Sequence, residues 1–312
     1  MLFNGQSGSG IVYIGQASST DAGATWTPYG SNPIISPGAA TTWNDEQVHA
    51  PCVVWDGSQS VMFADGYDGS NYRIGRWTNP YHDFAVHPGS WTAYGSNPII
   101  GLGSGYNVNG VIAPQVVYDA TLSPPWKMWM VGVNGSNVTT IGFYDSTDGI
   151  SWTDHGKVVD VGAGGSWNDE GVGLGCPVRN GSTWYIYLAG QSSTWASHYR
   201  AGYATVAVGS ETSAGAYTDH GVLSAFSGNI TTLDDAKTYQ SNTLTTVMAR
   251  GVSWVGYGTC FSPTVPATQY EASFRSTSTD LVTWTAPTGA LITLGTGWDA
   301  ISAENPTVVA VP

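Results

Sequence analysis

The stretch at residues 43–56, WNDEQVHAPCVVWD, decides the fold because degenerate copies of it return four more times along the chain. In each copy an aromatic residue or its substitute stands eight positions before a proline or its substitute, and a short apolar run follows. These residue pairs are Trp43/Pro51, Tyr106/Pro114, Trp167/Gly175, Asp235/Thr243 and Trp298/Pro306. The copies are 63, 61, 68 and 63 residues apart, which indicates five equivalent structural units.

A second marker keeps the same period. The sequence YGSNPII occurs at residues 29–35 and again at 94–100, and shorter relatives occur at 154–159, 219–223 and 288–292. Because two different markers recur with the same period, each supports the repeat independently of the other. We therefore predict a single domain over residues 1–312, because no linker or break in composition appears. Its repeat units span residues 43–105, 106–166, 167–234, 235–297, and 298–312 joined with 1–42.

Each unit carries four segments that read as strands, separated by Asp-Gly, Gly-Ser, Asn-Pro and Asn-Gly turn signals. In the first unit the segments are 52–55, 60–64, 72–77 and 97–100. In the third unit they are 177–178, 184–189, 199–206 and 222–223. Four short antiparallel strands repeated five times predict an all-β fold, a five-bladed β-propeller.

The ends of the chain complete the pattern. Leu2-Phe3 and Ile14-Gly15 align with Met62-Phe63 and Ile74-Gly75, so the chain begins on the second strand of a unit. Residues 305–311, NPTVVAV, match the innermost strand of the other units. We therefore predict that this segment pairs beside residues 1–4 and closes one blade, which removes an open sheet edge.

Composition limits the classes of partner. The net charge is −13 and only nine residues are Lys or Arg, so the chain cannot neutralise a nucleic-acid backbone. No apolar run long enough to cross a membrane occurs, and the N-terminus lacks the pattern of a signal peptide. Low charge with many Gly, Ser, Thr and Asn residues suggests an extracellular or virion-associated protein. Cys52 and Cys176 occupy the same strand position in separate units, which predicts buried thiols and no disulfide.

The segments WNDEQVHAPCVVWDG (43–57), KMWMVG (127–132) and IGFYDSTDGISW (141–152) resemble the five-bladed propeller glycoside hydrolases, the group of families 32, 43, 62, 68 and 130. The resemblance covers all five units. It implies cleavage of glycosidic bonds in a neutral glycan of arabinan, xylan or fructan type. In family 43, acidic residues stand immediately before the proline of this repeat. The chain departs from that pattern, since these positions hold Ala50, Ala113, Leu174, Asn242 and Asn305.

Residues 19–26, STDAGATW, resemble the Asp-box of sialidases, with shorter relatives at 146–152 and 278–284. Each of these segments combines an aspartate with a tryptophan, which invites a catalytic interpretation. We prefer a structural one, because an aspartate in a tight turn accepts backbone N–H groups and the tryptophan packs on the sheet. Asp21, Asp148 and Asp280 are accordingly predicted to form turns on the side away from the pocket.

Carboxylates gather where the innermost strands begin. Eight of the 22 acidic residues lie there: Asp45, Glu46, Asp169, Glu170, Asp234, Asp235, Asp299 and Glu304. Glycoside hydrolysis needs two carboxyl groups across the bond, and crowding of like charges raises one pKa to make an acid. The predicted catalytic residues are Glu46, Glu170, Glu304, Asp45 and Asp169. Solvated acidic loops, or a carboxylate cage for a Ca²⁺ or Na⁺ ion in the channel, are the alternatives; no other cofactor is expected.

A second set of residues is predicted to bind substrate. His49 occupies the repeat position of Glu304, so both could face one channel, although a lone histidine is often a hydrogen-bonded structural residue. Asp65 is a charge among apolar equivalents, which makes it either paired or functional. Aromatic residues at the rim could stack on sugar rings or could pack within the repeat. They are Trp43, Tyr106, Trp167 and Trp298.

Two functions of different class remain open from the sequence. The first is a glycoside hydrolase that uses paired carboxylates from the strand entries. The second is a non-catalytic propeller that binds glycan or forms a structural or receptor-binding part of a larger assembly, such as a phage particle. The carboxylates and the resemblance favour the first, and the missing acids before the prolines favour the second.

Overall fold

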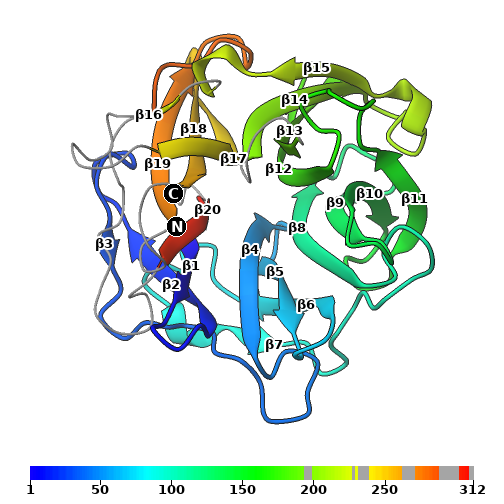
Figure 1. Ribbon diagram of the computed structural model, residues 1–312. Coiled ribbons are helices and arrows are strands. Elements are labelled where there is room, and N and C mark those ends of the chain that lie inside the picture. The colour runs from blue at the N-terminus through cyan, green and yellow to red at the C-terminus, as the bar shows by residue number, and fades with distance from the viewer. Residues whose placement is uncertain (193–198, 227–228, 231–238, 262–270, 288–301, 309–312) are drawn as a thin grey trace.

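The computed structural model describes residues 1–192, 199–226, 229–230, 239–261, 271–287 and 302–308. Within these ranges strands are the main regular structure, joined by turns and irregular segments, and the helices are three short 3₁₀ helices, η1 (Pro88–Ser90), η2 (Ala214–Ala216) and η3 (Ser224–Phe226). The all-β prediction is confirmed. Figure 1 shows several sheets arranged around a common centre, with β4, β8, β12, β17 and β20 nearest to that centre.

The strands of the described residues fall into five groups, two of which, the β4 and β8 groups, are joined in one eight-stranded sheet. Each group is called a sheet here and is named by the strand nearest to the centre. The β20 sheet has the order β20 (Ser302–Thr307), β1 (Leu2–Gln6), β2 (Val12–Ser18) and β3 (Thr27–Pro28). The β4 sheet contains β4 (Gln47–Trp55), β5 (Ser60–Tyr67), β6 (Tyr72–Asn79) and β7 (Thr92–Ala93). The β8 sheet contains β8 (Gly110–Tyr118), β9 (Trp126–Val133), β10 (Thr139–Ser146) and β11 (Thr153–Val159).

The remaining strands form two further sheets. The β12 sheet contains β12 (Gly171–Asn180), β13 (Thr183–Gln191), β14 (Tyr199–Ala207) and β15 (Thr218–Val222). The β17 sheet contains β16 (Asn229–Ile230), β17 (Tyr239–Arg250), β18 (Ser253–Phe261) and β19 (Glu271–Ser278). One parallel pairing, between Tyr72 and Gly110, links the β4 and β8 sheets. The relative of the second marker at residues 288–292 lies outside the described residues.

The C-terminal strand β20 pairs with the N-terminal strand β1, so the chain ends lie in one sheet. Leu2 pairs with Thr307 and Asn4 with Glu304, in antiparallel register. The strand begins at Ser302, three residues before the predicted start, and ends at Thr307, while residues 309–311 of the predicted segment lie outside the described residues. One sheet is thus assembled from both ends of the chain.

The innermost strands begin earlier than predicted, because pairing continues across a bulge before each proline. In β4 the register shifts between His49 and Cys52, where Ala50 adopts a left-handed backbone with φ of 47°. Ala113 and Asn305 do the same, with φ of 51° and 49°. A bulge leaves a backbone N–H without a partner in its own ladder. The strand therefore starts at Gln47 and not at residue 52.

Each of these three bulges donates a backbone N–H hydrogen bond to a side chain on the second strand of the neighbouring unit. The donor–acceptor pairs are Ala50 N–H to Asn4 Oδ1, Ala113 N–H to Asp65 Oδ1, and Asn305 N–H to Thr259 Oγ1, each 2.9 Å long. The acceptors differ in chemistry, but each offers an oxygen. We call this contact the bulge clasp. It registers the β20, β4, β8 and β17 sheets against one another where they approach the centre.

The aromatic residue of the first marker lies across two glycines of its own sheet. A Cβ atom added to Gly66 or Gly75 would stand 2.5 Å from a ring atom of Trp43. Tyr106 covers Gly132 and Gly142 in the same way, and Trp167 covers Gly190 and Gly202. Only a residue without a side chain leaves room for the ring at these distances. The repeated aromatic therefore has a packing role within the unit, and Trp298 lies outside the described residues.

The second marker has two structural roles. In the β8 and β12 sheets its aspartate accepts a hydrogen bond from the aromatic residue of the first marker, from Tyr106 Oη to Asp154 (3.0 Å) and from Trp167 Nε1 to Asp219 (3.0 Å). In the β4 sheet the Asn97 side chain bonds both backbone groups of Arg76, each at 2.9 Å. Both forms of the marker attach the outermost segment to the third strand.

The aspartates of the three Ser-Thr-Asp segments form turns, as predicted. Asp148 Oδ1 accepts the backbone N–H groups of Ile150 and Ser151, both at 2.8 Å. Asp21 and Asp280 make equivalent bonds. These hydrogen bonds hold the pKa of all three carboxyls below the ordinary value, for Asp280 at about 2. An acid that is so readily ionised is unsuited to donate a proton at neutral pH.

Cys52 and Cys176 are both free and buried, which confirms the prediction of buried thiols. Burial raises the pKa of the Cys52 thiol to about 11, so it stays protonated at neutral pH. The side chain of the third cysteine, Cys260, lies outside the described residues.

A first prediction follows from the aromatic that covers two glycines. We expect Gly66→Ala to lower the free energy of unfolding by about 1–3 kcal/mol, because the new methyl overlaps Trp43 and Asn44. Gly101→Ala is the matched control, since a Cβ there meets no atom within 4 Å. Thermal and urea unfolding of both variants measure the difference. Equal stability of the two would contradict the packing role of Trp43.

Candidate functional site

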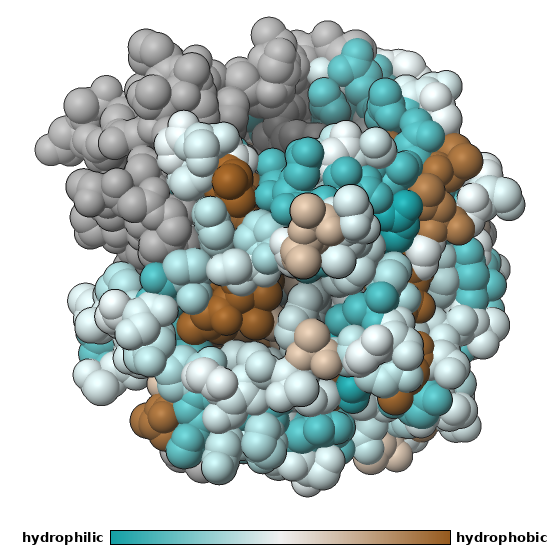
Figure 2. All heavy atoms as spheres, turned by 90° about the horizontal axis from the view of Figure 1, so that it is seen from below, coloured by the Kyte–Doolittle hydropathy of each residue, from teal (hydrophilic) through white to brown (hydrophobic). Residues whose placement is uncertain are grey.

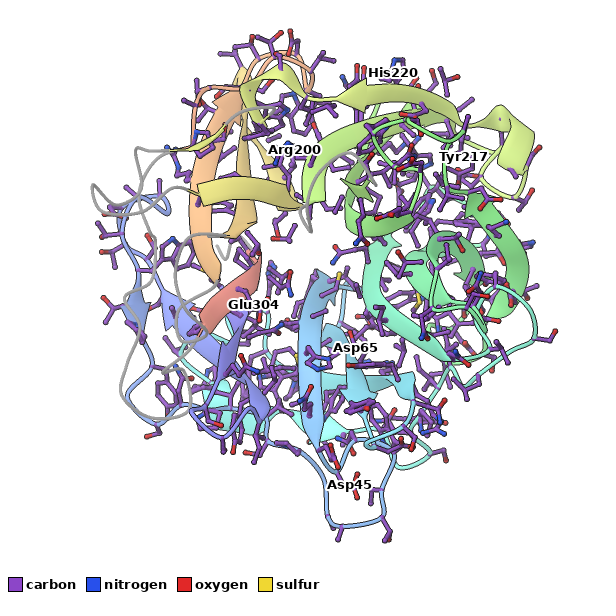
Figure 3. The ribbon with its side chains drawn as sticks, viewed as in Figure 1. Asp45, Asp65, Arg200, Tyr217, His220 and Glu304 are labelled. Carbon is purple, nitrogen blue, oxygen red and sulfur yellow. The ribbon has the colours of Figure 1, made fainter. Side chains whose placement is uncertain are left out.

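Two predicted residues lie on neighbouring innermost strands, near the centre of the sheets. His49 pairs with Asp65 in the β4 sheet, and Glu304 pairs with Asn4 in the β20 sheet, so the two occupy the same position of the repeat. Strand β20 lies against β4. Figure 3 shows Glu304 close to the centre and Asp65 beside β4, whereas Asp45 lies on an outer loop. We call the region around His49 and Glu304 the axial site.

His49 is held by an acceptor at each ring nitrogen. Nδ1 bonds to the carboxylate of Asp65, which is 2% exposed and also accepts the Ala113 N–H. Nε2 lies 2.8 Å from Gln47 Oε1, and Gln47 directs that oxygen at the ring because its Nε2 donates to the Gly10 carbonyl (3.1 Å). A ring that faces two acceptors needs a proton on both nitrogens to satisfy them. The geometry therefore favours the imidazolium form of His49.

The electrostatics of the site agree with this geometry. Burial acts to lower the pKa of His49, but the charge and hydrogen bond of Asp65, with a smaller effect from Glu304, raise it above the ordinary 6.5. The His49 side chain is 15% exposed and Glu304 is half-buried, so solvent screens neither completely. Asp65 is therefore paired, and its predicted role in substrate binding stays a prediction.

Two tyrosines that the sequence analysis missed complete the axial site. Tyr67 and Tyr72 stack with ring centroids 4.4 Å apart, and the Tyr72 ring lies 5.4 Å from that of His49. Burial, with the charge of Asp65 and the neighbouring Tyr67, raises the pKa of Tyr72 to about 12. Their signal in the sequence is the turn at residues 68–71, since residues that flank a two-strand turn face each other across the ladder.

The remaining predicted carboxylates occupy the loops before the innermost strands. Asp45 Oδ2 accepts the Thr41 N–H (2.6 Å), and Asp169 Oδ2 accepts the Gly165 N–H (2.7 Å), so both close their loop. Glu46 and Glu170 are exposed at equivalent positions, where their backbone N–H groups bond to the end of the second strand. The catalytic roles of these four residues stay predictions. Asp234, Asp235 and Asp299 lie outside the described residues.

The positions that carry acidic residues in family 43 hold no acidic residue in this chain, so they supply no carboxylate to the axial site. Ala50 and Ala113 supply only methyl groups at their bulges, and Asn305 supplies an amide. Within the described ranges, no group of three or more His, Cys, Asp or Glu side chains could hold a metal ion. In the same ranges no helix is long and apolar enough to cross a membrane.

Comparison with known proteins relates the fold to carbohydrate-active enzymes. No protein-family model matches the sequence, and no curated protein matches it either. Among solved structures, the chain is similar to a β-1,2-mannobiose phosphorylase from Listeria innocua, with a TM-score of 0.58 and 14% identity over 80% of this chain. The match covers 64% of the phosphorylase, so the chain spans less than two thirds of its length.

Two further structures show the same likeness. A glycosyl hydrolase from Bacteroides ovatus gives a TM-score of 0.62 with 13% identity, over 92% of this chain and 82% of that one. A member of the GH130 family of mannoside phosphorylases, which contains glycoside hydrolases that target β-1,2-mannosidic linkages in Candida mannan, gives 0.58 with 14% identity, over 85% and 81%. At such low identity the likeness concerns the fold alone.

A second prediction concerns the pH dependence of stability. A histidine whose pKa is raised by folding stabilises the protein fully below the unfolded pKa, and this contribution is lost as pH rises through the folded pKa. We therefore expect wild-type stability to fall as pH rises from about 6.5, the ordinary pKa of histidine. His49→Gln should remove this component, and so should Asp65→Asn.

Unfolding midpoints measured between pH 5.5 and 9 test this prediction. His82→Gln is the control, because His82 stacks on Trp55 and not on the axial site. If His49→Gln kept the full wild-type slope, the cationic assignment of His49 would be wrong.

Proposed function

We propose that the protein is a closed five-bladed propeller that cleaves a glycosidic bond of a neutral glycan at the axial site. The observation that carries this proposal is the placement of His49 and Glu304 at the same repeat position of adjacent innermost strands, where the charge of Glu304 helps to raise the pKa of His49. The arrangement of the sheets around one centre and the pairing of β20 with β1 support five blades. The similarity to glycoside hydrolases and phosphorylases supports a carbohydrate substrate.

Cleavage needs a group that protonates the departing oxygen and a group that activates the incoming nucleophile. We infer that His49 donates the proton, because Asp65 holds it in the cationic form, and that the Glu304 carboxylate removes a proton from the attacking water. The bond from the anomeric carbon to the bridging oxygen breaks as the bond to water oxygen forms. Gln47 must give up its hydrogen bond to Nε2 when the substrate oxygen takes its place.

The substrate class follows from the fold neighbours and the sequence together. Because the neighbours include proteins that act on mannosides, β-mannosides are the first candidate substrates. Arabinan, xylan and fructan are the further candidates, which the sequence suggests. Hydrolysis and phosphorolysis differ in the nucleophile, so dependence of turnover on added phosphate separates them. The stacked Tyr67–Tyr72 pair offers an aromatic edge beside His49 for a sugar ring.

The second candidate is a propeller that binds glycan without cleaving it. The observation that favours it is the pair of alanines, Ala50 and Ala113, at positions where family 43 carries acids. An extracellular or virion-associated location and assembly with a larger particle belong to this candidate as well.

A third prediction tests the catalytic assignment. We expect Glu304→Gln to lower turnover by roughly 10²- to 10⁴-fold with little change in melting temperature, because a catalytic carboxylate is lost and the strand pairing of β20 remains. Glu46→Gln, in an exposed loop, should leave turnover within about twofold. Reducing-sugar release from mannan, xylan, arabinan and fructan, with and without phosphate, provides the measurement.

The opposite pattern, with activity lost in Glu46→Gln or Glu170→Gln and kept in Glu304→Gln, would move the reaction to the strand-entry loops. Inactivity of the wild type on every glycan, combined with retained binding, would select the non-catalytic candidate.

A further inference from the structure

Two clefts occupy the same place in neighbouring repeat units, outside the axial site. The first has a volume of about 520 Å³ and lies between the loop before β4 and the turn between β5 and β6. Trp43 forms one wall, and Asp45, Ser70, Asn71 and Arg73 contribute to the lining. The second has a volume of about 550 Å³ and lies at the corresponding place of the β8 sheet.

The second cleft repeats the design of the first with different side chains. Tyr106 replaces Trp43 as the wall, and the turn at residues 134–137 replaces the turn at 68–71. Ser136, Thr140, Lys157 and Asp160 contribute polar groups. A cleft that recurs at one repeat position, with its aromatic wall kept, belongs to the architecture of the unit and not to a chance irregularity of one loop.

Each cleft contains a buried oxygen that lacks a hydrogen-bond partner among the described residues. Thr140 is 2% exposed, and its Oγ1 lines the second cleft without a partner. In the first cleft Asp45 Oδ1 is buried and unpaired in the same way, although Oδ2 of the same carboxylate closes the loop. An unpaired buried polar atom destabilises the fold. Such atoms occur elsewhere in the described residues too, and in these two clefts a hydroxyl-bearing ligand would supply the missing hydrogen bond.

The chemistry of the lining identifies the class of ligand. A sugar ring presents an apolar face to an aromatic wall and hydroxyl groups to the surrounding polar atoms. Carboxylates in both clefts, together with the net charge of −13, oppose a polyanionic glycan. The surface seen in Figure 2 is mainly hydrophilic, with hydrophobic residues in separate small patches, which gives an apolar partner little to cover. We propose that the two clefts are binding subsites for sugar rings of a neutral polysaccharide.

The clefts extend the surface available to one polysaccharide chain. Tyr67 and Tyr72 belong to the axial site and flank the turn at 68–71, whose side chains line the first cleft. The second cleft follows one repeat unit further around the ring. Binding at two linked subsites raises avidity without any change in the axial site. The inference does not depend on catalysis, because the clefts can hold glycan whether or not Glu304 acts on it.

The experiment blocks each cleft from a position that has no role in the fold. Ser70 and Ser136 are exposed in matching turns. Each serine bonds to the preceding Asp or Asn side chain through its backbone N–H group and not through its hydroxyl. Ser70→Arg and Ser136→Arg fill the clefts with a long side chain. Ser58→Arg is the matched control, since residues 56–59 (DGSQ) form the same kind of turn as residues 68–71 (DGSN), at the opposite end of β5.

Binding is measured by affinity electrophoresis and calorimetry with mannan, xylan, arabinan and fructan, in a Glu304→Gln background that prevents turnover. We expect each single variant to weaken binding of one of these polysaccharides roughly tenfold and the double variant to weaken it further, with Ser58→Arg unchanged. Thr140→Val should weaken binding while the melting temperature stays the same or rises, because the unpaired hydroxyl is removed.

Three results would overturn the proposal. They are wild-type affinity in the double variant, an absence of binding to all four polysaccharides by the unblocked protein, and full binding by Thr140→Val. Failure of the axial-site assignment looks different, because it changes turnover of Glu304 variants on short oligosaccharides and leaves the effect of cleft variants on polysaccharide binding intact.

Discussion

The aromatic ring that lies on two glycines is the contact on which the rest of each unit depends. Trp43, Tyr106 and Trp167 each bridge the second and third strands of a sheet and, from the same backbone, start the loop that enters the innermost strand. The ring fixes this loop over the end of the sheet. Because the loop then runs directly into β4, β8 or β12, the position of the ring sets where the innermost strand begins and which side chains reach the centre.

The bulge before the proline then determines which side chains form the axial site. The left-handed backbone of Ala50 lies at a shift in the register of β4, between the pairing of His49 and that of Cys52. His49 consequently faces Asp65, which also reaches across to Ala113 of the next sheet. One carboxylate thus orients the imidazole and joins two sheets. Structural and chemical roles are shared by the same atoms, so a change at Asp65 disturbs both.

The repeat period, the strand content and the pairing of both chain ends could be predicted from the sequence, because they depend on spacing that recurs along the chain. The second and third strands were placed within a few residues, since turn signals bound them at both ends. The early start of β4 could not be predicted, because a proline usually indicates the end of a strand. The bulge that accommodates the proline has no characteristic amino-acid composition that would reveal it.

Part of the candidate site could be identified from the sequence. Asp65 stands out as a charge where the other units have apolar residues, Glu304 is one of the carboxylates at the strand entries, and His49 occupies the repeat position of Glu304. Tyr67 and Tyr72 were missed because their stacking depends on cross-strand register, which one-residue shifts alter. The same kind of shift obscured the equivalence of Asn4 and Asp65. Both side chains accept a hydrogen bond from the bulge of the next sheet, but an alignment with a constant offset places them one residue apart. Asp45 and Asp169 each close a loop, and a carboxylate with that role has the same sequence signature as a catalytic one, so their catalytic roles stay predictions.

The bulge clasp also divides the ring into seams of two kinds. At the boundary between the β8 and β12 sheets, the residues at the clasp positions are Val131 and Leu174, and both belong to one buried apolar cluster. Attraction between apolar groups weakens on cooling, whereas the three clasps are hydrogen bonds, which lack that dependence. Cooling should therefore weaken the apolar packing around Val131 and Leu174 more than the clasps accepted by Asn4, Asp65 and Thr259.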